Sequence, residues 1–320
     1  YKDWITNYEI DGFRVDTVKH VNLEFWQEFM PEILAHAEAT RPEQDFFVFG
    51  EVFSGNPVLL SHYTSQADFP AVLDFRFQEQ VRAYASAGGS SDILRDLFAD
   101  DDYFTDADSN VYALPTFLGN HDRGRFGWFL DVDNGVLPDA EKVARSELAT
   151  AMMFFARGVP VIYYGDEQGF VGDGGDKDAR QDMMPSLVPS YNDDDLIGTD
   201  ATTADSNFDP THPLYQCYSD YAVLLADHPA LGSGAQLHRY SQAAQGIYAF
   251  SRIDRDEQVE YLVAFNNADS EQTASFMTDS PDTTFSQIYP ETGTPPAGTV
   301  LGVYCVIGGG GDEFLADDML

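Results

Sequence analysis

Short apolar runs that end in a carboxylate recur along the first half of the chain. The first run, residues 10–15, leads directly into Asp16, and a one-sided apolar pattern typical of a helix follows from about Asn22. The runs are continuously apolar rather than alternating, which favours strands of a parallel sheet that is covered on both faces. The pattern predicts five such strands, near residues 10, 46, 69, 113 and 159, with helices between them.

Acidic residues stand at the ends of three of these predicted strands. Asp16 follows the first strand, and Glu51 follows the second, 35 residues later. This spacing is close to the roughly 31 residues per unit of a closed eight-unit barrel. Asp122 comes about two units later. A single acid after a strand is commonly a helix cap or a solvated loop residue. Three in register predict a shared site, because the carboxyl ends of parallel barrel strands converge on one mouth.

The chain resembles the alpha-amylase family of glycoside hydrolases at these strand ends. The similar motifs are GFRVDTVKH (residues 12–20), GEVF (50–53), FLGNHD (117–122) and GVPVIYYGDEQ (158–168). The resemblance covers roughly residues 1–265. It implies an α/β fold, a (β/α)8 TIM barrel whose last five strands are present, followed by an all-β antiparallel sandwich domain. It also implies that the first three barrel strands belong to a segment that precedes Tyr1.

The resemblance assigns catalytic roles to the three acids by position. Asp16 matches the nucleophile, Glu51 the general acid and base, and Asp122 the carboxylate that holds the sugar in a distorted form. A retaining glycosidase needs one ionised and one protonated carboxyl group about 5 to 5.5 Å apart. Arg14, two residues before Asp16 and on the same strand face, should keep Asp16 ionised. Glu51 follows an apolar run and has no basic neighbour in sequence, so it should keep its proton more readily.

Further residues near the acids are candidates for substrate binding. His121 is expected to hydrogen-bond sugar hydroxyls beside Asp122, and Arg14 lies beside the nucleophile. Lys19 and His20 either bind sugar on the leaving-group side or are solvated loop residues. Aromatic side chains that could stack on sugars more often pack against the protein; they are Phe53, Trp128, Tyr163 and Tyr164.

The function that the resemblance implies is retaining cleavage of alpha-1,4-glucosidic bonds in starch-like glucans or maltooligosaccharides, through a covalent glycosyl-enzyme intermediate. Cyclomaltodextrinase, neopullulanase, alpha-glucosidase and glucan transferase activities stay open, because those enzymes share the same motifs. A non-catalytic carbohydrate-binding relative is disfavoured, because such a protein would normally have lost one of the three carboxylates.

The chain is strongly acidic, with 17 basic and 54 acidic residues and a formal net charge of −37. This charge argues against nucleic acid and anionic membranes as partners. Surfaces rich in Asp and poor in Lys are typical of proteins from salty surroundings, so we expect a salt-tolerant enzyme; an ordinarily acidic secreted hydrolase is the alternative. No apolar run is long enough to span a membrane. We expect an extracellular or periplasmic protein.

No cofactor is expected to be needed for the chemistry, although the resemblance allows a structural calcium ion. In many amylases a Lys-His pair like Lys19–His20 brings the histidine carbonyl to that ion. The acidic loops give no clear calcium site by sequence. The loop that begins at Asp106 has Val111 and Phe117 where an EF-hand needs glycine and glutamate, and the run Asp193–Asp195 has no supporting frame either. Two cysteines, Cys217 and Cys305, are expected to be buried free thiols.

The pattern changes at about Gly234 to short alternating runs separated by turn residues. Five strands are predicted, at residues 246–252, 259–267, 273–277, 285–289 and 299–307. We therefore expect a partial catalytic barrel over residues 1–233, a β-sandwich domain over 234–307 and a flexible acidic tail over 308–320.

Overall fold

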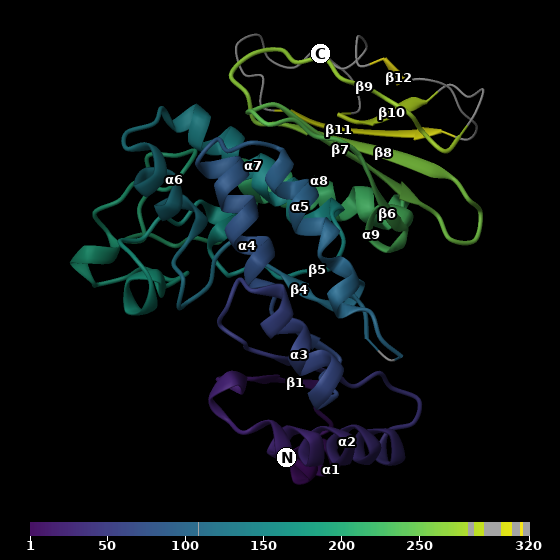
Figure 1. Cartoon of the computed structure of the whole chain (residues 1–320). Helices are drawn as coiled ribbons and strands as arrows, with labels where there is room; N and C mark the ends of the chain where they lie inside the picture. Colours follow the sequence, from purple (N-terminus) through teal and green to yellow (C-terminus); the bar gives the residue numbers. More distant parts are fainter. Residues whose placement is uncertain (108, 281–284, 291–301, 309–313, 316–320) are drawn as a thin grey trace. The chain divides into compact units, whose positions relative to one another are not determined.

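The computed structural model describes residues 1–107, 109–280, 285–290, 302–308 and 314–315. It divides into two compact units, one of residues 1–79 and 99–116 and the other of residues 80–98 and 117–320. Figure 1 shows the helices and strands of both units.

A parallel three-stranded sheet organises the first unit. Its order is β1 (Gly12–Val15), β2 (Phe47–Gly50) and β3 (Ala71–Val72), so strands that follow one another in sequence are also neighbours in space. The helices of this unit are α1 (Lys2–Tyr8), α2 (Leu23–Thr40) and α3 (Pro57–Ala67). Short 3-10 turns lie at Val18–His20, Asp101–Phe104 and Val111–Ala113. The strand–helix–strand order is the predicted one.

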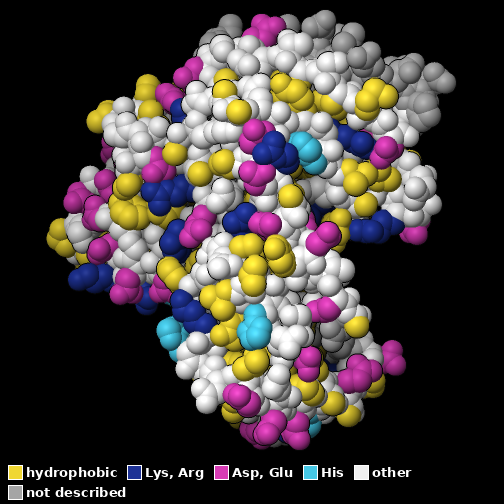
Figure 2. Space-filling view, viewed as in Figure 1, with side chains coloured by type: hydrophobic (Ala, Val, Ile, Leu, Met, Phe, Trp, Pro, Cys, Tyr) yellow, Lys and Arg dark blue, Asp and Glu magenta, His cyan; other side chains and the backbone are white. Residues whose placement is uncertain are grey.

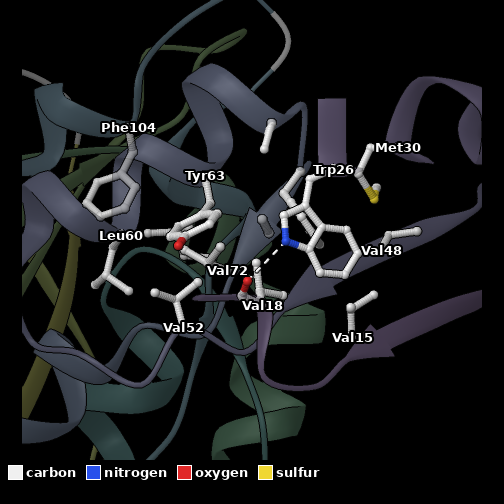
Figure 3. Packing of buried hydrophobic residues seen from close by; sticks show 14 of the residues in the cluster. Val15, Val18, Trp26, Met30, Val48, Val52, Leu60, Tyr63, Val72 and Phe104 are labelled. Carbon is white, nitrogen blue, oxygen red and sulfur yellow. Dashed lines mark hydrogen bonds between the residues drawn. The ribbon is translucent and has the colours of Figure 1, made fainter. Parts of the chain in front are cut away.

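The core of the first unit forms where α2 and α3 pack on the sheet. Trp26 and Met30 from α2 lie against Val15 and Val48, and Leu60 comes from α3 (Figure 3). The indole N–H of Trp26 donates a hydrogen bond of 3.0 Å to the carbonyl of Val18. A buried tryptophan needs such a partner for its N–H. The bond therefore ties the loop after β1 to the core.

Along the chain, helices of the second unit both precede and follow the last barrel strand. They are α6 (Phe126–Asn134), α7 (Asp139–Phe155), α8 (Pro213–Asp227) and α9 (Ala230–Ser233), with a π-helical turn at Arg82–Ser86. Helices α4 (Phe75–Val81) and α5 (Asp92–Ala99) each begin in one unit and end in the other. The 3-10 turns are Asp166–Gln168, Asp176–Ala179 and Pro189–Tyr191. Between Tyr191 and Pro213 the chain is irregular.

All five predicted barrel strands are present. The fourth and fifth are β4 (Pro115–Thr116) and β5 (Val159–Pro160), each of two residues. They are shorter than the apolar runs that predicted them, because the assignment of a strand needs ladder hydrogen bonds as well as an apolar sequence. No helix in the described part of the chain is long and apolar enough to cross a membrane.

A five-stranded antiparallel sheet forms the C-terminal part of the second unit (Figure 1). Its order is β10 (Ser286–Tyr289), β11 (Gly302–Gly308), β8 (Glu260–Asn266), β7 (Ile247–Ile253) and β6 (Ala235–Tyr240). Strand β9 (Ser275–Phe276) pairs with β12 (Phe314–Leu315), which falls in the predicted acidic tail; residues 309–313 and 316–320 of that tail lie outside the described residues. The sequence did not predict β6, an edge strand without a clear alternating pattern.

Hydrogen bonds join the C-terminal sheet to the π-helical turn within the second unit. The Tyr84 hydroxyl donates to the carbonyls of Gly246 (2.7 Å) and Phe265 (3.0 Å). The Asn267 amide donates to the carbonyls of Tyr84 and Gly89, both at 2.8 Å. Both side chains are fully buried. Cys217 is a buried free thiol, as predicted, whereas the side chain of Cys305 lies outside the described part of the structure.

Candidate active site

Strands β1 and β2 end side by side, and each is followed at once by a predicted catalytic acid. Val15 is paired with Gly50 in the parallel register, so Asp16 and Glu51 are the next residues on the two neighbouring strands. The Glu51 N–H donates to the Val15 carbonyl (2.7 Å), and the Val18 N–H donates to the Glu51 carbonyl (3.0 Å). The main chain therefore fixes the two acids next to each other at the carboxyl edge of the sheet.

The two acids have different surroundings. The Asp16 side chain is 60% exposed, and its Oδ1 lies 2.9 Å from Nη1 of Arg14, which is the ion pair that the sequence predicted. Glu51 is buried, with 7% of its surface exposed. Its Oε2 accepts a hydrogen bond of 2.8 Å from the main-chain N–H of Thr17. One acid is thus charge-paired and open to solvent, whereas the other is enclosed and held by the main chain.

Lys19 and His20 lie in the 3-10 turn that follows Asp16. The Lys19 ammonium donates a hydrogen bond of 2.5 Å to the carbonyl of Phe53, and it lies 5.5 Å from the centre of the Phe53 ring. The Phe53 ring in turn lies 4.8 Å from that of Phe75. Lys19 therefore joins the two strand-end loops, and Phe53, 38% exposed, keeps part of its surface open.

His121 and Asp122 lie in a tight turn of the second unit. The side-chain oxygen of Asn120 accepts hydrogen bonds from the N–H groups of Asp122 (2.9 Å) and Arg123 (2.8 Å). Asn120 and Gly124 also exchange two main-chain hydrogen bonds of 3.1 Å. Since Gly124 has φ 101°, in the region that favours glycine, the turn depends on that residue.

Two cationic or polar side chains approach the Asp122 carboxylate. His121 Nε2 lies 3.2 Å from one oxygen, and Arg180 Nη2 lies 3.7 Å from the other. Arg180 also pairs with Asp176 at 2.8 Å. The sequence predicted His121 as a neighbour of Asp122 but did not single out Arg180, which lies 58 positions further along the chain.

A buried arginine, Arg125, follows the Asp122 turn and bonds it to other segments of the second unit. Arg125 Nη1 donates to Asp166 (2.9 Å) and to the Tyr164 carbonyl (2.8 Å), and its Nε donates to the side chain of Gln181 (2.7 Å). Aromatic rings surround the guanidinium: those of Tyr163, Tyr164 and Phe170. Sequence reasoning missed Arg125, although an arginine three residues after a predicted catalytic acid, in a chain this poor in basic residues, was a usable signal.

The aromatic residues considered as sugar-stacking groups mostly pack against other side chains of the protein. Tyr163 and Tyr164 enclose Arg125, and Trp128 lies 5.2 Å from the ring of Phe129. Tyr164 still has 43% of its surface exposed.

Three carboxylates outside the strand ends gather in the second unit. One oxygen each of Asp173, Asp193 and Asp194 lies within 4.8 Å of the other two. Desolvation, together with the charges of Asp173 and Asp193, raises the pKa of Asp194 to about 6. Hard oxygen donors this close are the kind that Ca²⁺ takes as ligands.

The predicted site residues divide between the two units. Arg14, Asp16, Lys19, His20 and Glu51 lie in the first unit, whereas His121 and Asp122 lie in the second. Their convergence on one barrel mouth stays a prediction.

Comparison with known proteins defines the class to which this arrangement belongs. Residues 1–196 match the model of the alpha-amylase family, described as "Alpha amylase, catalytic domain", so the chain belongs to that family of glycoside hydrolases. An alpha-amylase of Streptomyces lividans is 48% identical over 298 residues, which are 93% of this chain and 32% of that protein. A beta/alpha-amylase of Paenibacillus polymyxa is 29% identical over 271 residues, 84% of this chain and 19% of that protein.

Solved structures agree on the fold. An Anoxybacillus alpha-amylase superposes with a TM-score of 0.74 at 24% identity, over 97% of this chain and 61% of that one. A cyclomaltodextrinase superposes with a TM-score of 0.66 at 20% identity, over 98% of this chain and 46% of that one. The fold is therefore the TIM barrel with a C-terminal β domain that the sequence predicted. The chain spans about a third of the Streptomyces lividans enzyme.

Proposed function

We propose that this chain carries the catalytic acids of a retaining alpha-amylase that cleaves alpha-1,4 bonds of starch-like glucans. The observation that carries the proposal is the pair of acids at the ends of β1 and β2. Asp16 is exposed and paired with Arg14, and Glu51 is buried beside it. A retaining glycosidase needs two neighbouring carboxyl groups with such unequal surroundings.

In the proposed reaction Asp16 attacks the anomeric carbon of the sugar while Glu51 gives its proton to the glycosidic oxygen. The bond between that carbon and oxygen breaks, and the sugar is left as an ester of Asp16. Glu51 then takes a proton from water, whose oxygen attacks the same carbon and releases Asp16. Asp122 would hold sugar hydroxyls in the distorted ring, with His121 and Arg180 fixing its carboxylate.

The proposal is tested by the products formed from soluble starch, using the protein expressed from its full-length gene. NMR of the first products should show reducing maltooligosaccharides as the alpha anomer, and Asp16→Asn should abolish them. Beta-anomer products would exclude the retaining mechanism. A folded protein that binds maltooligosaccharides without turning them over would be a non-catalytic relative.

Hydrolysis competes with transfer to a sugar hydroxyl, because both start from the same ester of Asp16. Neopullulanase, cyclomaltodextrinase, alpha-glucosidase and glucan transferase activities would each use the same acids. The ratio of new linkages to reducing ends in the products separates transfer from hydrolysis, and comparison of starch, pullulan and cyclodextrin separates the hydrolases.

Salt tolerance is part of the proposal. Acidic side chains are spread over the visible face rather than gathered in one patch (Figure 2), which fits a net charge of −37 that salt must screen. We also propose a structural calcium ion, for which Asp173, Asp193 and Asp194 supply suitable donors. A polymeric substrate suggests action outside the cytoplasm, which fractionation of the activity would test.

A further inference from the structure

The main chain adopts a left-handed conformation at Thr17, directly after the proposed nucleophile. Thr17 has φ 53° and ψ 33°, in the left-handed region. Other described non-glycine residues with positive φ are Glu9, Asp68, Asp176 and Gln258, and none of them is β-branched. Glu9 and Asp68 follow the last residues of helices, where this conformation is ordinary. Thr17 ends no helix, and a β-branched side chain resists this backbone conformation.

The unusual turn aims the Thr17 N–H at the carboxyl group of Glu51. The hydrogen bond to Oε2 is 2.8 Å long, and the Glu51 side chain is buried. The peptide unit between residues 16 and 17 carries this N–H. The same unit joins the Cα of Asp16 to that of Thr17, so one peptide connects the two proposed catalytic acids.

Contacts on both sides hold Thr17 in this conformation. Its carbonyl accepts from the His20 N–H at 2.9 Å, and the next residue, Val18, donates to the Glu51 carbonyl at 3.0 Å. The Val18 carbonyl accepts from the buried indole of Trp26 (Figure 3). Strained conformations persist only where the surrounding structure fixes them, and they gather at functional sites.

We propose that Thr17 is a positioning residue whose left-handed main chain, through its N–H, holds the carboxyl group of Glu51 in place beside Asp16. This inference rests on the proposed roles of Asp16 and Glu51. It assigns the work to the main chain and not to the threonine hydroxyl. Misplacing a catalytic group by about 1 Å costs on the order of 100-fold in rate.

The test compares two substrates that need Glu51 to different extents. Breaking the bond in a maltooligosaccharide requires a proton on the leaving oxygen, whereas alpha-maltosyl fluoride releases fluoride and needs little help from an acid. The ratio of the two kcat/KM values therefore reports how well Glu51 is placed. An overall loss of structure would lower both values together.

The sharpest variant exchanges the Thr17 N–H for an ester oxygen, by incorporating the α-hydroxy analogue of threonine in the full-length protein. We expect kcat/KM for maltotetraose to fall about 100-fold and that for the fluoride by less than about 5-fold. The matched control is the same exchange at Gln258, which also has positive φ (58°) and whose N–H donates to the main-chain carbonyl of Asp254 at 3.1 Å. It should leave the ratio unchanged.

A second variant covers the case in which the ester protein does not fold. Thr17→Gly keeps the main-chain N–H and adopts the left-handed conformation more readily than threonine does, so the ratio should stay as in the wild type. Thr17→Asn, which also tolerates the conformation and keeps the N–H, should behave the same way. Equal losses on both substrates or an unchanged ratio in the ester variant would overturn the proposal, and so would a shifted ratio in Thr17→Gly, because it would assign the placement of Glu51 to the threonine side chain. A wild-type protein that turns over neither substrate would instead contradict the proposed function.

Discussion

Arg125 and Asp166 form a buried ion pair, with 2.9 Å between Nη1 and Oδ1 and with exposed side-chain fractions of 0% and 9%. The pair connects the turn that carries Asp122 to the loop after β5. Because Arg125 also bonds to Tyr164 and Gln181, its guanidinium joins three segments of the second unit. The position of Asp122 thus depends on a charge that solvent does not reach.

Removing Arg125 should be costly for stability. In Arg125→Met the Asp166 carboxylate stays buried without its partner, and we expect the free energy of unfolding to fall by about 3–5 kcal/mol. Urea denaturation followed by circular dichroism measures this change. In the double variant Arg125→Met/Asp166→Leu the total loss should be smaller than the sum of the single losses. Additive losses would mean that the ion pair does not couple the two residues.

Lowering the pH from about 6 to about 4 should stabilise the second unit. Burial raises the pKa of Asp166 to about 6, although Arg125 opposes the shift, and Asp194 is raised to about 6 as well. The folded state therefore binds more protons than the unfolded state between about pH 4 and 6. The contribution of these groups to the free energy of unfolding falls as the pH rises through that window.

The variant Asp194→Asn tests the pH prediction at the more exposed of the two groups. It should flatten the dependence of the melting temperature on pH between 4 and 6. At pH 7 we expect a gain of no more than about 1 kcal/mol, because solvent screens the repulsion. Asp227→Asn, an exposed acid at the end of α8, is the control and should leave the slope as in wild type. An unchanged slope in Asp194→Asn would contradict the prediction.

Calcium should stabilise the protein through the three clustered carboxylates if they are its ligands. At constant ionic strength, Ca²⁺ at 100 times its dissociation constant would add about 2.7 kcal/mol, and chelation would reverse the gain. Asp194→Asn should lose most of this effect, whereas Asp227→Asn should keep it. Equal calcium responses in the two variants would place the ion elsewhere. Differential scanning calorimetry measures each response.

Salt should raise the melting temperature most steeply at low concentration. The Debye length falls from about 10 Å at 0.1 M to about 3 Å at 1 M, so most of the repulsion within a chain of charge −37 is screened by 1 M. We expect a rise on the order of 5 °C between 0.05 and 1 M KCl, with NaCl equivalent. A flat response over that range would leave an ordinary acidic hydrolase as the better description.

The parts of this structure that depend on local pattern were predictable from the sequence. Apolar runs gave the five barrel strands, and equal spacing from the strand ends gave the pairing of Asp16 with Glu51. The left-handed turn at Thr17 was not predictable, because threonine, unlike glycine or asparagine, gives no signal for that conformation. The partners of Arg125 were not predictable either, because they come from loops 39 to 56 positions away.

The hydrogen bonds of Tyr84 and Asn267 bear on how members of this family can be recombined. A chimera cut at residue 234 would transfer the C-terminal sheet without the turn that fills its hydrogen-bonding positions. Asn267 would then lose the carbonyls of Tyr84 and Gly89, and Tyr84 would remain in the donor without its acceptors. The exchangeable module is discontinuous in sequence: a graft of this sheet has to carry residues 80–98 with it.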